Sequence, residues 1–241
     1  MGAKKKVQSK RTNQGFNNVV DINATKQERS VSILPRNKNQ ELYVSTLLDK
    51  SKDIVFGLGP AGTGKTLLAV QAAVKLFKEG VVDQLIITRP AVSVDEDLGF
   101  LPGTLEEKMA PWTRPIFDVL KDYFDARQIS SMIEEGVIEI SPLAYMRGRT
   151  FKRSFILADE MQNATPSQMK MLLTRLGEHS MMAVTGDLGQ ADRLKSNGLL
   201  DFTNKLVSVK SSCIEVITFG LGDIERHRAV KEVLRVYGDE D

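Results

Sequence analysis

The octet at residues 59–66 constrains the fold of this chain more than any other part of its sequence. It reads Gly-Pro-Ala-Gly-Thr-Gly-Lys-Thr and joins an apolar run at residues 54–58 to a run with helical periodicity at residues 67–77. In a strand–loop–helix setting, the pattern G-x-x-x-x-G-K-[ST] forms a phosphate-binding loop. The glycines let successive backbone N–H groups point inward, and the following helix presents the positive end of its dipole. The sequence therefore predicts a nucleoside triphosphate site; the alternative is a glycine-rich turn that holds no ligand.

Individual roles follow from the chemistry of such a loop. Lys65 should reach the β- and γ-phosphates, and the hydroxyl of Thr66 should bind Mg²⁺, which prefers octahedral coordination by oxygen. The expected cofactors are therefore Mg²⁺ and a nucleoside triphosphate, ATP in the first place. The residues expected to contact the nucleotide are Gly59, Pro60, Ala61, Gly62, Thr63, Gly64, Lys65, Thr66 and Leu67.

The composition fits one large domain inside the cell. The chain has 241 residues, of which 41% are hydrophobic, so it can bury a substantial core. No apolar stretch reaches the roughly eighteen residues of a membrane span, and the polar amino-terminal segment lacks a signal-peptide core. We therefore expect a soluble, cytoplasmic protein without a membrane partner. A lone cysteine, Cys213, excludes an intrachain disulfide, and two histidines offer no Cys/His metal cluster.

Positive charge is concentrated at the amino terminus. Residues 1–29 carry seven Lys and Arg side chains and two acidic ones, although the whole chain has a formal net charge of +2. We interpret residues 1–32 as a basic flexible arm, which either attracts nucleic acid or serves as a solubilising tail. Residues 33–238 should form the folded domain, and residues 239–241 an acidic tail.

Strand-like and helix-like segments alternate along the folded part of the chain. A long proline-bearing stretch, residues 90–115, interrupts the alternation, and stretches of this length are usually functional or disordered. Alternating strands and helices predict an α/β fold with a mainly parallel sheet covered by helices on both faces. The expected strands are 53–58, 84–88, 137–141, 155–158, 181–185 and 214–218, and the expected helices are 39–48, 67–77, one that contains Ile116 to Phe124, 166–177 and 223–236.

Two carboxylates follow one of the predicted strands. Parallel α/β sheets bind ligands outside the carboxyl ends of their strands, and both the octet and the pair Asp159-Glu160 fall there. An apolar strand followed by such a pair is typical of a Walker-B element, in which Asp159 holds Mg²⁺ and Glu160 orients the attacking water. The alternative is an acidic pair that interacts with the dipole of a helix N-terminus.

Two glutamine-containing patterns narrow the class. Residues 159–162 have the form D-E-x-Q and residues 186–190 the form G-D-x-x-Q, at the ends of successive predicted strands. They resemble motifs II and III of superfamily 1 helicases, in which the glutamines sense the γ-phosphate and link it to the nucleic-acid surface. The resemblance implies nucleotide contacts for Gln162, Asp187 and Gln190.

Four further blocks resemble the PhoH-like family of bacterial and bacteriophage ATPases. They are T-R-P-A-V at residues 88–92, L-G-F-L-P-G at 98–103, P-L-A-Y-M-R-G-R-T at 142–150 and D-I-E-R-H at 223–227. The similarity runs from about Ile33 to Tyr237. It implies a single RecA-like core, ATP hydrolysis, a role in RNA metabolism, a ring-like homo-oligomer such as a hexamer, and cytosolic residence. Residues 1–32 show no KH-like or nuclease-like module of the kind that longer relatives carry, so RNA recognition by such a module is not expected.

Gln40 lies 19 residues before Gly59, where helicase-like ATPases often carry a glutamine that reads the edge of adenine. A buried amide at this place can form two hydrogen bonds with adenine and disfavour guanine. The alternative is an exposed residue at the start of a helix. Specificity for ATP is therefore a hypothesis.

One RecA-like lobe alone lacks a transition-state arginine, which superfamily 1 helicases take from a second lobe. The missing positive charge must come from the same lobe or from a neighbouring subunit, and single-lobe ring ATPases usually use an arginine in trans. Arg226 is the first candidate because its block resembles the terminal helix of the family, and Arg228 is the second. A charged helix surface is the alternative for both.

Basic and aromatic side chains, which we expect near the nucleotide end of the sheet, supply candidates for binding RNA or single-stranded DNA, which requires a positive track and stacking faces. Arginines also pair with carboxylates, and aromatic side chains also fill cores, so a structural role is the alternative. The candidates are Arg89, Trp112, Arg114, Arg147 and Arg149, with Lys108, Tyr145, Lys152 and Arg153 as further ones.

Taken together, these patterns predict a Mg²⁺-dependent ATP hydrolase that is coupled to nucleic acid in a helicase-like way, with Lys65, Glu160, Gln190 and Arg226 as its catalytic residues. A nucleotide-dependent assembly protein and a kinase for a small acceptor are the alternatives. Glu160 favours water as the acceptor, because it stands beside the residue expected to bind the metal.

Overall fold

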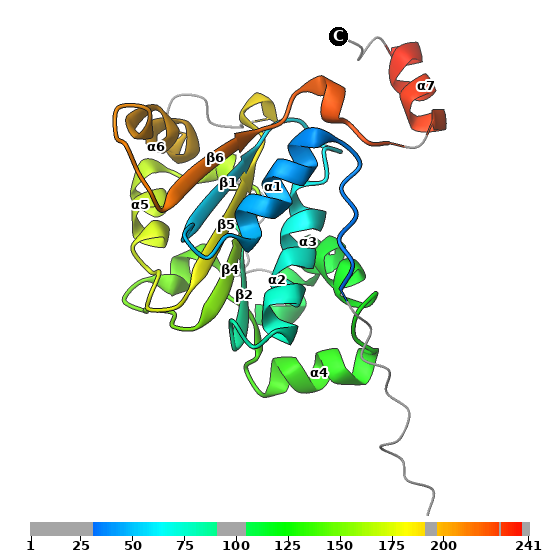
Figure 1. The fold of residues 1–241 in the computed structure, drawn as a ribbon. Coiled ribbons are helices and arrows are strands. Elements are labelled where there is room, and N and C mark those ends of the chain that lie inside the picture. The colour runs from blue at the N-terminus through cyan, green and yellow to red at the C-terminus, as the bar shows by residue number, and fades with distance from the viewer. Residues whose placement is uncertain (1–30, 91–104, 191–196, 227, 238–241) are drawn as a thin grey trace, which may run out of the picture. The chain divides into compact units, whose positions relative to one another are not determined.

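Six parallel strands form the sheet in the described part of the chain (Figure 1). Their order is β3-β2-β4-β5-β1-β6, and each pair of neighbours is parallel. All residues of β1, β4 and β5 are buried, as expected of interior strands with helices on both sides. The strands are β1 (Ile54–Leu58), β2 (Gln84–Thr88), β3 (Ile138–Ile140), β4 (Ser154–Ala158), β5 (Met181–Gly186) and β6 (Ile214–Thr218).

The structure, a computed structural model, describes residues 31–90, 105–190, 197–226 and 228–237. These residues belong to one compact unit that begins at Val31. The predicted basic arm lies almost wholly outside the described residues, and the L-G-F-L-P-G block and the acidic tail lie outside them as well.

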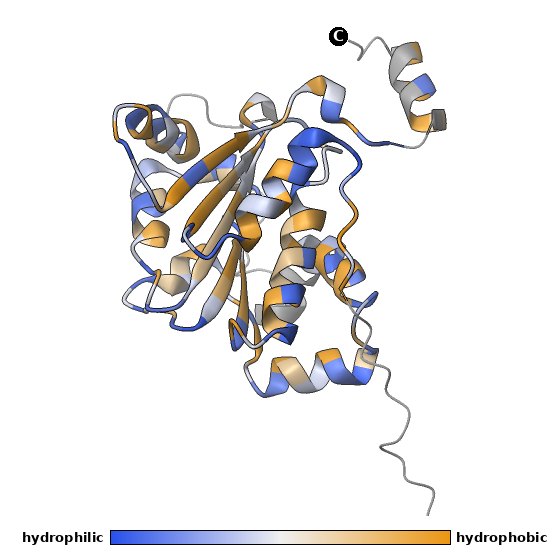
Figure 2. Cartoon of the chain, in the orientation of Figure 1, coloured by the Kyte–Doolittle hydropathy of each residue, from blue (hydrophilic) through white to orange (hydrophobic). Residues whose placement is uncertain are grey.

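Helices cover both faces of the sheet, which confirms the predicted α/β architecture. On one face, α1 (Lys38–Leu48), α2 (Lys65–Lys78), α3 (Leu105–Leu120) and α4 (Ala126–Glu134) contribute to one buried apolar cluster. On the other face, α5 (Pro166–Leu173) and α6 (Gly198–Leu206) contribute to a second buried apolar cluster. The last helix, α7 (Arg228–Tyr237), comes after β6 in the chain. Figure 2 shows hydrophobic residues along β1, β2 and β4 and hydrophilic ones in the turns between elements. No helix within the described ranges has the length and apolar character of a membrane span.

The register of the strands aligns their carboxyl ends. Leu58 of β1 is paired with Gly186 of β5, and Ala158 of β4 is paired with Val184 of β5. The residues that follow β1, β4 and β5 therefore emerge side by side at one edge of the sheet. This is the edge at which parallel α/β sheets bind ligands, and it carries the three motif segments that the sequence places there.

The bounds of α3 correct the prediction of an irregular stretch at residues 90–115. The helix begins at Leu105 and includes Pro111 and Pro115, although proline is normally excluded from helix interiors. Each proline costs a backbone hydrogen bond, but Ile116 and Leu120 are buried in the cluster that α3 shares with α2, and this burial favours the helix. Residues 91–104 lie outside the described part.

Other helices also differ from their predictions. The sequence predicts neither α4, which begins at a capping box between Asp125 and Gln128, nor α6. The last helix begins at Arg228 instead of residue 223, because the Asp223 carboxylate accepts the backbone N–H of Gly220 and closes a short turn. α5 ends at Leu173 instead of residue 177. The late start of α7 matters most for the site, since a short 3₁₀ helix, η5 (Leu221–Asp223), ends at Asp223 and residues 224–226 are not helical.

Candidate functional site

The loop between β1 and α2 has the backbone that its glycines allow. Gly59 and Gly62 have φ angles of +141° and +85°, in the region that disfavours side chains. A methyl group on Gly59 would come within 2.3 Å of the carbonyl oxygen of Phe219, so glycine is also required by the close approach of the segment after β6. Gly59 N–H donates to the carbonyl of Gly186 at 3.1 Å, which fixes the loop to the end of β5.

Lys65, the first residue of α2, lies folded over this loop. Its ammonium Nζ donates to the carbonyl oxygens of Gly59 and Pro60 at 2.6 and 2.7 Å, and it makes no ion pair among the described residues. Burial lowers the pKa of Lys65, and the negative charges of Asp187, Glu160 and Asp159 oppose this effect only in part. A buried ammonium held by neutral carbonyls can exchange them for phosphate oxygens, which supply the missing negative charge.

Three oxygen-bearing side chains meet where the octet touches the end of β4. The hydroxyl of Thr66 donates to Asp159 Oδ1 at 2.8 Å, and the hydroxyl of Thr185 donates to the same oxygen. Thr66 and Asp159 are therefore close together, as the sequence predicts. Sequence reasoning misses Thr185, which is 1% exposed; its position directly before Gly186-Asp187 at a strand end is the signal that could have identified it.

Glu160 and Gln162 connect the ends of β4 and β5. Glu160 has a φ of +56°, which costs a non-glycine residue about 1–3 kcal/mol and is typical of functional positions. Gln162 is 2% exposed, donates through Nε2 to the Glu160 carboxylate and accepts the backbone N–H of Asp187 at 3.1 Å. The two glutamine-containing patterns are thus joined through Gln162, which orients Glu160.

A cleft of about 260 Å³ lies between these segments. Its size suits a polyphosphate and a metal ion, since pockets for whole drug-sized ligands occupy about 300–1,000 Å³. The described residues contain no cluster of three or more His, Cys, Asp or Glu that could cage a metal. One hydroxyl and one carboxylate instead suit Mg²⁺, which takes few protein ligands and completes its shell with phosphate and water. The cleft is lined by Ala61, Gly62, Gly64, Lys65, Thr66, Leu67, Asp159, Glu160, Thr185, Gly186 and Asp187.

Gln40 lies against the phosphate loop. It is 4% exposed, so it is not the exposed helix-start residue of the alternative interpretation. Its Nε2 donates to the carbonyl of Thr63 at 3.1 Å, and its Oε1 accepts the backbone N–H of Arg36 at 2.8 Å. One amide hydrogen and one lone pair are left for a ligand. Recognition of adenine stays a prediction, and the observed contacts show that Gln40 fixes α1 to the loop.

Arg226 is neither on a helix nor remote from the phosphate loop of its own chain. A methyl group on Gly62 would come within 2.5 Å of Arg226 Nε, and the backbone N–H of Glu225 donates to the carbonyl of Gly62 at 3.0 Å. The interpretation of Arg226 as part of a charged helix surface is therefore wrong. The side chains of Arg228 and Gln190 lie outside the described part.

The candidates for nucleic-acid contacts are in different environments. Arg89 is half-buried, and its Nη1 reaches the carbonyl of Trp112 at 3.5 Å, with Trp112 itself half-buried. Arg114 and Arg147 are exposed, as is Tyr145. Arg149 pairs with Glu139 and lies over the ring of Phe151 at 4.5 Å from its centroid, and the side chain of Lys108 lies outside the described part.

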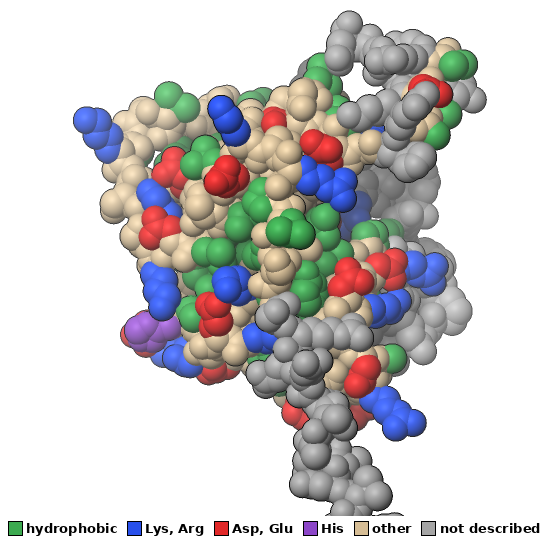
Figure 3. Space-filling model, turned by 45° about the vertical axis from the view of Figure 1, so that its right-hand side comes forward, with side chains coloured by type: hydrophobic (Ala, Val, Ile, Leu, Met, Phe, Trp, Pro, Cys, Tyr) green, Lys and Arg blue, Asp and Glu red, His purple; other side chains and the backbone are tan. Residues whose placement is uncertain are grey.

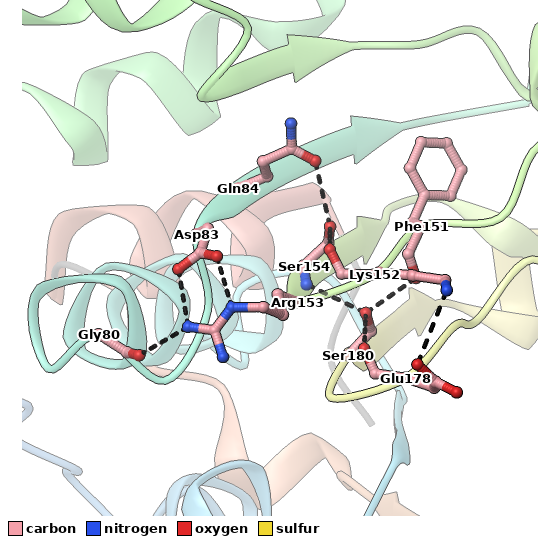
Figure 4. Close-up of polar contacts among 9 residues, drawn as sticks. All are labelled: Gly80, Asp83, Gln84, Phe151, Lys152, Arg153, Ser154, Glu178 and Ser180. Carbon is pink, nitrogen blue, oxygen red and sulfur yellow. Dashed lines mark hydrogen bonds and ion pairs between the residues drawn. The ribbon is translucent and has the colours of Figure 1, made fainter.

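Lys152 and Arg153 lie at the opposite edge of the sheet. They directly precede β4, and Figure 4 shows Arg153 pointing to the carboxylate of Asp83, to which it donates two hydrogen bonds. Lys152 pairs with Glu178 at 3.7 Å. The prediction that these two residues lie near the nucleotide end of the sheet is therefore wrong, because the chain crosses back along the sheet between β3 and β4. Among the described residues on the face in Figure 3, Lys and Arg alternate with Asp and Glu around central hydrophobic side chains and form no continuous basic track.

This geometry defines the class of protein. A parallel sheet with a phosphate loop after β1, a carboxylate after β4 that contacts the loop, and helices on both faces is the core of the RecA-like P-loop ATPase fold. The chain belongs to the PhoH-like protein family, whose model matches residues 32–238. The predicted fold class and the family resemblance are both confirmed.

Known proteins similar to this chain agree with the assignment. It is 44% identical over 224 residues to a PhoH-like protein of Bacillus subtilis, covering 92% of this chain and 69% of that protein. It is 40% identical over 209 residues to protein PhoH of Escherichia coli K12, covering 85% of this chain and 58% of that protein. The crystal structure of the HK97 bacteriophage large terminase is similar with a TM-score of 0.54 at 12% identity, covering 88% of this chain and 50% of that one, which shows a shared fold.

Proposed function

We propose that the protein is a Mg²⁺-dependent ATPase that couples ATP hydrolysis to the binding of single-stranded nucleic acid, RNA in the first place. The contact between Thr66 and Asp159 carries this proposal. It brings together a hydroxyl from the phosphate loop and a carboxylate 93 residues further along the chain. The alternative, a glycine-rich turn that binds no ligand, does not require a carboxylate from the end of another strand at this position.

Each residue of the cleft has a defined task in this proposal. The loop amides and Lys65 bind the phosphates, with Lys65 leaving the carbonyl oxygens of Gly59 and Pro60. Thr66 and Asp159 hold Mg²⁺, which when bound supplies positive charge to the β- and γ-phosphates. Glu160 orients the attacking water, and Gln162 fixes the direction of the Glu160 carboxylate.

The link to nucleic acid is supported by the path from Gln162 to β5. Gln162 contacts both Glu160 and the backbone of Asp187, and η3 (Leu188–Gln190) follows directly, so a change at the γ-phosphate reaches this segment through one side chain. Exposed Arg114 and Arg147 offer positive charge for phosphate backbones. Assembly into a homo-oligomeric ring such as a hexamer, and residence in the cytoplasm, are proposed from the resemblance to the family.

Phosphate release tests the proposal. The full chain with Mg²⁺-ATP should release phosphate without an added acceptor, and single-stranded RNA should accelerate release with a steep dependence on salt. Lys65→Ala should abolish nucleotide binding, and Glu160→Gln should bind ATP without turnover. Arg127→Ala, at an exposed position on α4, is the matched control.

Three outcomes would contradict the proposal in different ways. A requirement for a small acceptor would indicate a kinase, and ATP binding without release would indicate an assembly protein. Stimulation by single-stranded DNA alone would exclude RNA as the partner.

Two further measurements address the choice of nucleotide and the oligomeric state. Equal hydrolysis of GTP by wild type and Gln40→Ala would remove the hypothesis that the protein is specific for ATP. The mass of the protein in solution decides its oligomeric state.

A further inference from the structure

The segment that follows β6 crosses the phosphate loop of its own chain. This crossing segment comprises Phe219–Arg226. Near its start, the backbone N–H of Phe219 donates to the carbonyl of Leu58 at 2.7 Å, and near its end, that of Glu225 donates to the carbonyl of Gly62 at 3.0 Å. Two backbone hydrogen bonds thus fix the crossing segment to the end of β1 and to the middle of the loop.

Asp223 attaches the middle of the crossing segment to α1. Its carboxylate accepts hydrogen bonds from the side-chain amide of Asn39 at 2.7 Å and from the backbone N–H of Gly220 at 2.8 Å. Its carbonyl accepts a longer one from the side chain of Asn37 at 3.4 Å. Because Gln40 also joins α1 to the loop through Thr63, the crossing segment, α1 and the loop hold one another in place.

These attachments place Arg226 directly at the loop. Its Nε, Cγ and Cδ would lie 2.5, 3.2 and 3.4 Å from a methyl group on Gly62, so the side chain extends along this residue. Gly62 lines the cleft. Arg226 is half-buried, yet among the described residues its guanidinium has neither a hydrogen-bond partner nor an ion-pair partner. A partly desolvated guanidinium without an anion beside an anion site is suited to receive one.

We propose that Arg226 contacts the β- and γ-phosphates of the nucleotide bound to its own chain, and that the arginine of this site is therefore supplied in cis. The proposal rests on the proposed ATPase function. The crossing segment supplies the arginine that a second lobe or a neighbouring subunit supplies in related enzymes. The arginine neutralises charge that develops on the transferred phosphoryl group, and its planar fork can contact two phosphate oxygens at once.

Kinetics of full-length variants test the role of the side chain. Arg226→Ala should lower kcat by at least about 100-fold, while the Kd for ATP rises by less than about tenfold, because the arginine acts mainly as charge develops. Arg226→Lys keeps the charge and should retain an intermediate kcat. Arg127→Ala is the control for loss of one exposed arginine. A purely structural role predicts equal losses for the alanine and lysine variants, and normal turnover of Arg226→Ala overturns the proposal.

Mixing two inactive variants distinguishes cis from trans. Lys65→Ala lacks a working phosphate loop and Arg226→Ala lacks the arginine, so a site that takes its arginine in trans regains both parts at some interfaces of a mixed assembly. The two variants are co-expressed with different tags and purified through both. The cis arrangement predicts no restored phosphate release, and a monomer that hydrolyses ATP leads to the same conclusion. Restored release in the mixed assembly overturns the proposal. A wild-type chain without ATPase activity contradicts the proposed function instead.

Discussion

Thr185 is the residue whose replacement tests the geometry of the cleft most directly. Its buried hydroxyl donates to Asp159 Oδ1, the oxygen that also accepts the hydroxyl of Thr66. Valine has nearly the same shape as threonine, so Thr185→Val removes the donor and leaves the packing almost unchanged. The variant therefore isolates one hydrogen bond to the proposed metal ligand.

The magnitude follows from the charge on Asp159. A hydrogen bond to a charged group contributes about 1.5–3 kcal/mol, and about 1.4 kcal/mol corresponds to a factor of ten in an equilibrium constant. Thr66 leaves Asp159 for Mg²⁺ in the proposed complex, so Thr185 is then the hydroxyl that still orients the carboxylate. We expect the Mg²⁺ concentration for half-maximal activity to rise about 10- to 100-fold, the range found when a residue that orients a metal ligand is replaced.

The assay is phosphate release at saturating ATP across a Mg²⁺ titration, with urea unfolding of the same samples. Thr185→Ser keeps the hydroxyl and should behave like wild type in both measurements. Thr174→Val is the matched control, because Thr174 is exposed directly after α5 and its hydroxyl bonds only to Lys170, Met171 and Arg175 among the described residues, none of which lines the cleft. Wild-type Mg²⁺ dependence and wild-type stability of Thr185→Val would refute the reasoning.

Three further predictions concern other parts of the structure. Gly62→Ala and Gly80→Ala both place a side chain at positive φ (+85° and +69°), and each should lose about 1–2 kcal/mol of unfolding free energy. Gly80→Ala is the control, because the added methyl group contacts Arg226 only at Gly62. The loss of ATP affinity in Gly62→Ala, measured by calorimetry, should therefore shrink in an Arg226→Ala background, and an unchanged loss would contradict the contact. Because burial lowers the pKa of Lys65 from 10.5, the free protein gains stability as pH rises through the lowered value toward 10.5. Phosphates should raise the pKa of Lys65, so binding of Mg²⁺-ATP in this pH window should take up a proton and weaken as the pH rises. Calorimetry in buffers of different ionisation enthalpy measures this proton uptake, and proton release would contradict the prediction. Arg153→Ala should leave the affinity for single-stranded RNA unchanged, because Arg153 is paired with Asp83 at the far edge of the sheet. Arg147→Ala should reduce both the affinity and its salt dependence. Equal effects of the two variants in a filter-binding assay would contradict this placement of the RNA.

Much of the site can be predicted from the sequence because local patterns determine it. The octet specifies a strand, a loop and a helix in one continuous segment, and the parallel sheet then aligns Asp159 with it. The contact from Thr66 to Asp159 follows from these two facts and is observed at 2.8 Å. The strand at residues 214–218 is likewise predicted from its apolar run and found with these bounds.

The remaining parts depend on contacts between residues far apart in the chain. Glu225 bonds to Gly62, and Asn39 bonds to Asp223, pairs that no local pattern joins. The α-helix predicted to begin at residue 223 does not form there, because Asp223 closes a turn instead. Pro111 shows the reverse case, in which burial of neighbouring residues keeps a helix that local rules interrupt. The local sequence determines whether a segment is helical or irregular only where tertiary contacts do not contribute more free energy than the local preference.

The polar groups of the cleft bond to one another, and the contacts that a ligand must replace determine how the site selects it. Lys65 donates to loop carbonyls, Thr66 to Asp159, and Gln162 to Glu160. A ligand that binds must break the first two of these contacts, so it gains little from the number of hydrogen bonds it forms. The net gain in binding comes chiefly from negative charge placed beside the buried ammonium of Lys65, and Arg226, whose guanidinium has no partner among the described residues, adds a smaller part. Each further phosphate adds charge at this point, so affinity should rise steeply from nucleoside monophosphate to triphosphate, and the cleft recognises a polyphosphate by its charge before any contact with the base.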